Sequence, residues 1–242
     1  MIDIVYPWKR SGTWELSRSI MFANLNIEHR LIFVIGDDPK MGSGVVHIGY
    51  VDKSDPNTNI IHKALAACDN PMISDPFLLM SDDHFVLKPV AEWPFAQRGN
   101  MKVSRGPYGK ILANTIAECQ KRGLPILNYD CHRPMLIHKA PYKASYAGVK
   151  ACVPKSLYGN TVGGGVACVD AKKIVRGMAE PYNYSEHTFI SSMSNPRRAF
   201  VLAIDKLLGI DPEAKAEVVK RVKTFHLVRK HLTKTAEECS VE

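Results

Sequence analysis

The sequence has no long hydrophobic run, and this absence excludes a membrane-spanning helix. No window of the 242 residues approaches 18 consecutive apolar residues, which is about the shortest stretch that reads as a span. The N-terminus also lacks a charged segment followed by an apolar one. We therefore predict no signal peptide and a cytoplasmic protein.

Two kinds of motif are missing as well. There is no GxGxxG and no GxxxxGK[ST], so neither of the common glycine-rich phosphate loops is present. No two cysteines form a CxxC pair or have zinc-finger spacing, so we expect reduced thiols rather than a structural zinc site. The six cysteines are Cys68, Cys119, Cys131, Cys152, Cys168 and Cys239.

Positive charge is in excess: 32 Lys and Arg against 24 Asp and Glu give a net charge of +8. Much of the excess lies in residues 215–234, where apolar residues recur at roughly helical spacing between the cations. We therefore predict a basic helical C-terminal segment over residues 206–242. A chain of this charge favours an anionic partner such as nucleic acid, a nucleotide or a membrane surface.

Short apolar runs alternate with helical patterns along the first half of the chain. We predict strands at residues 3–6, 29–36, 45–48 and 77–80, with helices over 13–24 and 59–68 between them; a further helix is expected over 110–122. The order β-α-β-β-α-β is typical of a Rossmann-like α/β domain, with a mostly parallel central sheet flanked by helices. This single domain is predicted to extend over residues 1–205.

The stretch from Phe77 to Leu87 contains two adjacent carboxylates and an imidazole between apolar runs. Buried charge is costly unless it is paired or binds a metal ion. Asp82, Asp83 and His84 are therefore expected at the carboxyl end of a buried strand, where open α/β sheets bind ligands. Oxygen ligands with one imidazole suit Mn²⁺ or Mg²⁺ bridging a diphosphate. The competing interpretation is a strand-end turn with solvated acids.

A second candidate pair is Asp130 and His132, which lie two residues apart and therefore on one side of an extended segment. A carboxylate and an imidazole on one face can act as orienter and general base. A hydrogen-bonded pair with no catalytic role is the alternative.

Three stretches in this order resemble nucleotide-sugar-dependent transferases of the GT-A type, and the Stealth-like group among them. They are Asp3 to Trp8 (an Asp-hydrophobic-Val-Tyr-x-Trp run), Phe77 to Val86, and His132 to Ile137 with its His-x-Pro segment. The Ser-Leu-Tyr-Gly-Asn element at Ser156 to Asn160 is similar to one in phage glycosyltransferases that decorate modified DNA bases. The chain departs from the Stealth pattern at Lys9-Arg10, where Val-Asp is usual.

The resemblance implies a GT-A domain with a donor half over about residues 1–90 and an acceptor half over about 91–205. Asp82, Asp83 and His84 would bind the divalent ion, with Asp82 also reaching the donor. Because GT-A enzymes often take a further metal ligand from late in the chain, His187, His226 and His231 are candidates for a third ligand. Further donor contacts would come from Tyr6, Trp8, Arg10 and Asn160. His132 would deprotonate the acceptor hydroxyl, with Asp130 as orienter or alternative base.

The expected activity is therefore transfer of a sugar from a UDP-sugar to a hydroxyl group by an inverting, metal-dependent displacement. The favoured acceptor is a hydroxymethylpyrimidine in phage-type DNA, which would place the protein in the cytoplasm of a host cell. Two alternatives remain: a Stealth-like transferase that builds surface polysaccharide, and a nucleic-acid-binding module without catalytic activity.

Overall fold

The computed structural model describes residues 1–10, 14–42, 44–149, 151–167, 172–174, 188–192, 204–206 and 208–209. For residues 172–174 and 189–192 only the backbone is described. His187, His226, His231, Cys168 and Cys239 lie outside the described residues, as does nearly all of the predicted basic segment.

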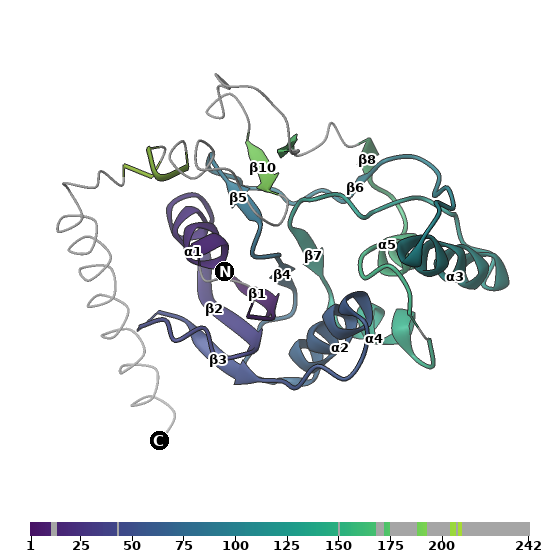
Figure 1. Ribbon diagram of the computed structural model, residues 1–242, viewed down its shortest axis with the longest axis horizontal. Coiled ribbons are helices and arrows are strands. Elements are labelled where there is room, and N and C mark those ends of the chain that lie inside the picture. Colours follow the sequence, from purple (N-terminus) through teal and green to yellow (C-terminus); the bar gives the residue numbers. More distant parts are fainter. Residues whose placement is uncertain are drawn as a thin grey trace.

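A five-stranded mixed sheet forms the centre of the molecule, in the order β3-β2-β1-β4-β7 (Figure 1). The first four strands, β3 (Val46–Gly49), β2 (His29–Gly36), β1 (Ile2–Trp8) and β4 (Phe77–Leu79), are parallel. The last, β7 (Met135–Ile137), runs antiparallel to β4. The predicted α/β class and the mostly parallel sheet are thus confirmed.

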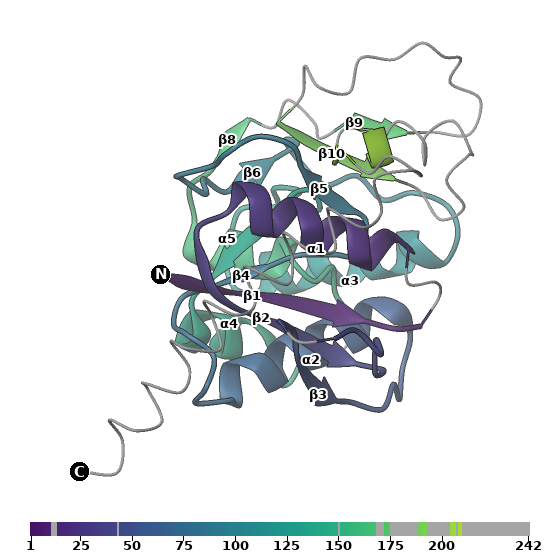
Figure 2. The ribbon, with the colours of Figure 1, turned by 90° about the vertical axis from the view of Figure 1, so that its left-hand side faces the viewer.

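Helices cover both faces of this sheet. Helix α1 (Trp14–Asn26) lies over one face, and α2 (Pro56–Asp69) over the other (Figure 2). On the α2 side, α3 (Pro107–Lys121), α4 (Lys139–Tyr146) and α5 (Ser156–Val162) complete the layer. Two smaller sheets carry the order β5-β10-β9 and β6-β8. Their strands are β5 (His84–Val86), β6 (Ala96–Gln97), β8 (Val166–Ala167), β9 (Lys172–Ile174) and β10 (Phe189–Ser192).

Side-chain alternation along β1 assigns its residues to two separate cores. Ile4, Tyr6 and Trp8 pack on the α1 side, whereas Val5 packs on the α2 side. Pro7 shares the face of Val5, because successive side chains of a strand point to opposite faces. This alternation decides which residues of the strand reach the site described below.

Helix α2 begins three residues before the predicted start. Asp55 is the N-cap: its carboxylate accepts hydrogen bonds from the backbone N–H groups of Asn57 and Thr58. Pro56 occupies the first helical position, where its missing N–H costs nothing. The helix therefore presents Asn57 and Ile60 to the carboxyl ends of β1 and β4.

Four of the six cysteines lie within the described residues. Cys68, Cys119, Cys131 and Cys152 are buried and free of disulfides. Among the described helices, none combines the length and the apolar content that crossing a bilayer requires.

Gly159 on α5 allows a test of how closely α5 packs on the loop that precedes β7. A Cβ at this position would lie 2.5 Å from Cγ of Tyr129, a ring that is almost completely buried. Replacing a helical glycine with alanine usually stabilises a protein, but here the clash reverses the sign. We expect Gly159→Ala to lower the free energy of unfolding by about 1–3 kcal/mol. Thermal unfolding measures this, with Gly49→Ala as the control, since nothing lies within 4 Å of that Cβ. Equal or higher stability of Gly159→Ala would contradict the packing.

Candidate functional site

The turn after β4 carries the acidic pair. The backbone N–H of His84 donates to the carbonyl of Ser81 at 3.0 Å, so these two residues close a β-turn. The backbone N–H of Ser81 in turn donates to Nδ1 of the His84 ring at 3.1 Å. Asp82 and Asp83 occupy the two central positions of this turn. As expected from the sequence, the turn lies at the carboxyl end of a buried strand.

The two aspartates have different surroundings. Burial, together with the negative charges of Asp83 and Glu15, raises the pKa of Asp82 to about 7. The charge of Asp82 also contributes, after burial, to a raised pKa of the Tyr6 hydroxyl, which lies on the α1 side of the sheet. Asp82 is not among the described side chains whose ligand atoms gather around Asp83, so the two carboxylates do not form one ligand pair.

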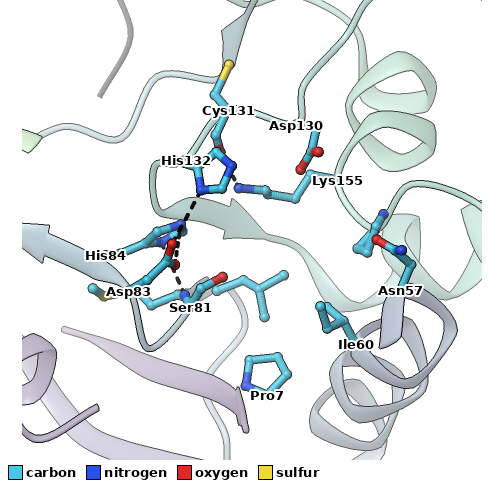
Figure 3. A pocket seen from close by; sticks show the side chains of 13 residues that line it. Pro7, Asn57, Ile60, Ser81, Asp83, His84, Asp130, Cys131, His132 and Lys155 are labelled. Atoms are coloured by element: carbon cyan, nitrogen blue, oxygen red, sulfur yellow. Dashed lines mark hydrogen bonds and ion pairs between the residues drawn. The ribbon is translucent and has the colours of Figure 1, made fainter. Parts of the chain in front are cut away.

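Asp83 instead lies between two imidazoles (Figure 3). Its Oδ2 is 3.4 Å from Nδ1 of His132, and its Oδ1 is 3.9 Å from Nε2 of His84. Burial would raise the pKa of Asp83, but the hydrogen bond from His132 and the positive charge of neighbouring groups, Lys155 among them, lower it overall. The carboxylate is therefore ionised at neutral pH and is suited to orient an imidazole.

His132 lies in a loop that immediately precedes β7, not in the extended segment that the sequence suggested. Lys155 holds this loop: its Nζ donates to the carbonyl of Cys131 and, at 3.1 Å, to that of Arg133. Burial lowers the pKa of Lys155, and the charges of Asp130 and Asp83 oppose that shift. The lysine thus positions His132 and brings a basic group to the same site.

A cavity of about 90 Å³ opens beside these groups. It lies at the carboxyl ends of β1 and β4, bounded by the start of α2 on one side and the His132 loop on the other (Figure 3). The site residues that line it are Ser81, Asp83, His84, Asp130, His132 and Lys155. Between β1 and β4 the chain switches from adding strands on one side of β1 to adding them on the other. Such switch points form the ligand crevice of open α/β sheets.

The predicted Mn²⁺ or Mg²⁺ fits these residues poorly. In the described part of the chain, the group of side chains with ligand atoms within 4.8 Å of one another is Asp83, His84 and His132, without Asp82. One carboxylate and two imidazoles differ from the oxygen-rich set that Mg²⁺ prefers. Moreover, Nδ1 of His84 accepts a hydrogen bond, so the proton of the neutral ring is on Nε2, the atom that faces Asp83. We derive no step through a metal ion.

The other predicted residues lie outside this constellation or play a different part in it. The carboxylate of Asp130 lines the cavity and accepts a hydrogen bond from the Tyr108 hydroxyl, whereas the carboxylate paired with His132 is that of Asp83. Tyr6 and Trp8 are buried on the α1 side of the sheet and do not line the cavity.

Arg10 and Asn160 have structural partners. The Arg10 guanidinium is exposed and donates to the carbonyl of Asp38 at 3.0 Å. The Asn160 amide is buried; it accepts from the backbone N–H of Leu127 at 2.9 Å and donates to its carbonyl at 2.7 Å. Asn160 therefore holds the strand-like segment before the His132 loop rather than facing the cavity.

Sequence reasoning missed Lys155 and the backbone of Ser81. Lys155 stands alone between Pro154 and the Ser-Leu-Tyr-Gly-Asn element, and no local pattern marks it. The Ser81 N–H carries no side-chain signal at all. Alternation along β1, by contrast, is visible in the sequence and places Pro7 on the opposite face from Tyr6 and Trp8. Only the structure shows that the cavity lies on the Pro7 face.

Comparison with known proteins identifies no family: no family model matches the sequence, and no curated protein matches it significantly.

Proposed function

We propose that the protein is a glycosyltransferase of the GT-A type that moves a sugar from a nucleotide-sugar, such as a UDP-sugar, to a hydroxyl acceptor. The observation that carries this proposal is the Asp83–His132 pair in a cavity at the switch point between β1 and β4. In sheets of this strand order, nucleotides bind at that crevice.

The chemistry needs a base, and His132 is suited to be one. A neutral imidazole that donates from Nδ1 to Asp83 keeps the lone pair of Nε2 free to accept a proton. In the proposed step, Nε2 of His132 takes the proton of the acceptor hydroxyl. The hydroxyl oxygen at the same time forms a bond to the anomeric carbon of the sugar. The bond from that carbon to the donor phosphate breaks, and the departing nucleoside diphosphate keeps the electron pair. A single displacement of this kind inverts the anomeric centre.

One feature of the site favours an anionic donor. Lys155 brings a basic group to the cavity, and basic side chains favour phosphate groups. A cavity of about 90 Å³ admits only part of a donor, since sites for whole ligands have roughly 300–1,000 Å³. The rest of the nucleotide-sugar would extend beyond it.

For the acceptor we propose a hydroxymethylpyrimidine in DNA. The net charge of +8 supports a polyanionic partner. Binding through phosphate contacts weakens steeply with salt, because each contact releases counterions. A neutral glycan acceptor would not show this dependence.

The test is incubation with a panel of UDP-sugars and hydroxymethylated DNA, with and without Mn²⁺ and with EDTA, followed by mass spectrometry of the digested nucleosides. We expect a mass increase of one sugar on the modified base and loss of transfer as salt rises. The Mn²⁺ arm checks the predicted metal requirement separately.

Three outcomes would contradict the proposal in different ways. Transfer to a neutral glycan with no dependence on salt would replace the DNA acceptor by a polysaccharide. DNA binding without transfer from any donor would favour a non-catalytic binding module. If the protein neither binds a nucleotide-sugar nor transfers a sugar, the transferase assignment itself is wrong.

A further inference from the structure

His84 is a buried histidine whose two ring nitrogens have separate environments. Its side chain is 4% exposed. Nδ1 accepts the backbone N–H of Ser81 at 3.1 Å, and Nε2 lies 3.9 Å from Oδ1 of Asp83. Burial is the main cause that lowers its pKa, to about 3, so the ring is neutral at physiological pH.

A neutral imidazole carries one proton, and the hydrogen bond at one nitrogen decides where that proton is. A backbone N–H can only donate, so Nδ1 of His84 must offer its lone pair to Ser81. The ring proton is therefore on Nε2. That atom faces Asp83, and the separation of 3.9 Å is longer than a hydrogen bond but close enough for a strong charge–dipole attraction.

The same rule bears on metal binding. A histidine binds a metal ion through an unprotonated nitrogen and usually donates its other N–H to a carboxylate or a carbonyl. In His84 the proton also faces a carboxylate, but the lone pair that would bind an ion accepts a backbone N–H instead. Binding an ion at Nε2 would require the Ser81 hydrogen bond to break.

We propose that His84 is a positioning residue that presents its Nε2–H to Asp83, so that this carboxylate stays directed at Nδ1 of His132, and that it is not a metal ligand. The chain of contacts is Ser81 N–H to His84, His84 to Asp83, and Asp83 to His132. One proton mediates each of these contacts. In the last contact the proton is on Nδ1 of His132, so Nε2 of that ring is unprotonated and faces the cavity. As a part of catalysis this inference rests on the proposed function, whereas the tautomer itself does not.

The tautomer can be measured directly in the full-length protein. Long-range ¹H–¹⁵N correlation spectra of histidine-labelled protein distinguish protonated from unprotonated ring nitrogens, and His84→Gln and His132→Gln assign the signals. At neutral pH we expect a proton on Nε2 of His84 and on Nδ1 of His132. Adding Mg²⁺ or Zn²⁺ should leave the His84 ring signals unchanged. A proton on Nδ1 of His84, or displacement of its Nε2 signal by either ion, would overturn the proposal.

The influence of His84 on His132 needs its own readout. We expect His84→Ala to shift the Nδ1–H resonance of His132 and to lower turnover by about tenfold, as the loss of an outer hydrogen-bond partner typically does. His84→Gln, whose amide can still donate toward Asp83, should retain more of both. An unchanged His132 resonance in a folded His84→Ala protein would overturn the positioning role. The wild-type spectra remain decisive if the alanine variant does not fold.

Failure of this inference and failure of the proposed function are separable. If no sugar is transferred but the spectra show the expected tautomers, the proposed function fails and the hydrogen-bond arrangement stands. If sugar is transferred but His84 responds to metal ions, the transferase assignment stands and His84 is a ligand.

Discussion

Replacing His132 with glutamine is expected to lower the turnover number for sugar transfer by about 10²–10⁴-fold, the usual contribution of a general base. The side chain is 29% exposed and lies at the edge of the cavity, so its replacement should leave the fold intact. Donor binding, measured by calorimetry, should change little, because the imidazole acts on the acceptor. The loss should therefore appear in kcat rather than in donor affinity.

Two further variants sharpen this prediction. His138→Gln is the matched control: this histidine is about half exposed and lies 4.0 Å from the exposed Asp75, so transfer should be unaffected. Asp83→Asn should also lower kcat, and the double variant should lose little more than His132→Gln alone, because residues that act as one unit are not additive. A folded His132→Gln protein with wild-type turnover would show that His132 is not the general base.

Replacing Asp3 with alanine is expected to lower the free energy of unfolding by about 2–4 kcal/mol, because a buried donor left without its acceptor costs about 1–3 kcal/mol. The Arg30 side chain is 46% exposed, so water can hydrate its charge when Asp3 is removed. Asp3 is completely buried. Its carboxylate accepts from Arg30 at 3.0 and 2.5 Å, and from the backbone N–H groups of Leu31 at 3.1 Å and Ser74 at 2.7 Å. Removing it leaves three donor groups without this partner: two on β2 and one in the segment before β4.

Urea denaturation measures this loss, and an exposed ion pair provides the control. Asp69 and Lys143 approach to 2.5 Å, the same distance as Asp3 and Arg30, but both side chains are more than half exposed. Exposed pairs contribute little, because water screens them. Asp69→Ala should therefore have a much smaller effect, and an equal effect of the two variants would show that burial of Asp3 is not what matters.

The role of Asp3 also changes how the first motif of the sequence is interpreted. The Asp-hydrophobic-Val-Tyr-x-Trp run looked like a donor-binding strand, but its polar first residue ties β1 to its neighbours, and its two aromatic residues fill the α1-side core. Pro7, between those aromatics, is the residue of the run that lines the cavity. The sequence motif therefore predicts the strand correctly, but most of its side chains pack in the core or connect strands instead of binding a donor.

Helix boundaries show the same dependence on local chemistry. Periodicity predicted the helix at 59–68, and its start shifted to Pro56 because Asp55 caps it and proline fits the first position. Periodicity alone cannot detect a cap, which acts on only the first turn. Helix α3 likewise begins at Pro107 rather than at the predicted residue 110.

The sequence by itself determined the order of strands and helices over the first 80 residues, the mostly parallel sheet, and the position of Asp83 at the end of a buried strand. These follow from apolar periodicity and from the cost of burying charge, both of which depend on residues close together in the chain. Only the tertiary structure decided the partner of Asp83. Because β7 runs antiparallel beside β4, with Met135 opposite Leu79, the loop before β7 meets the turn after β4. That meeting brings His132 to Asp83, whereas Asp82 stays outside the group of possible ligand atoms.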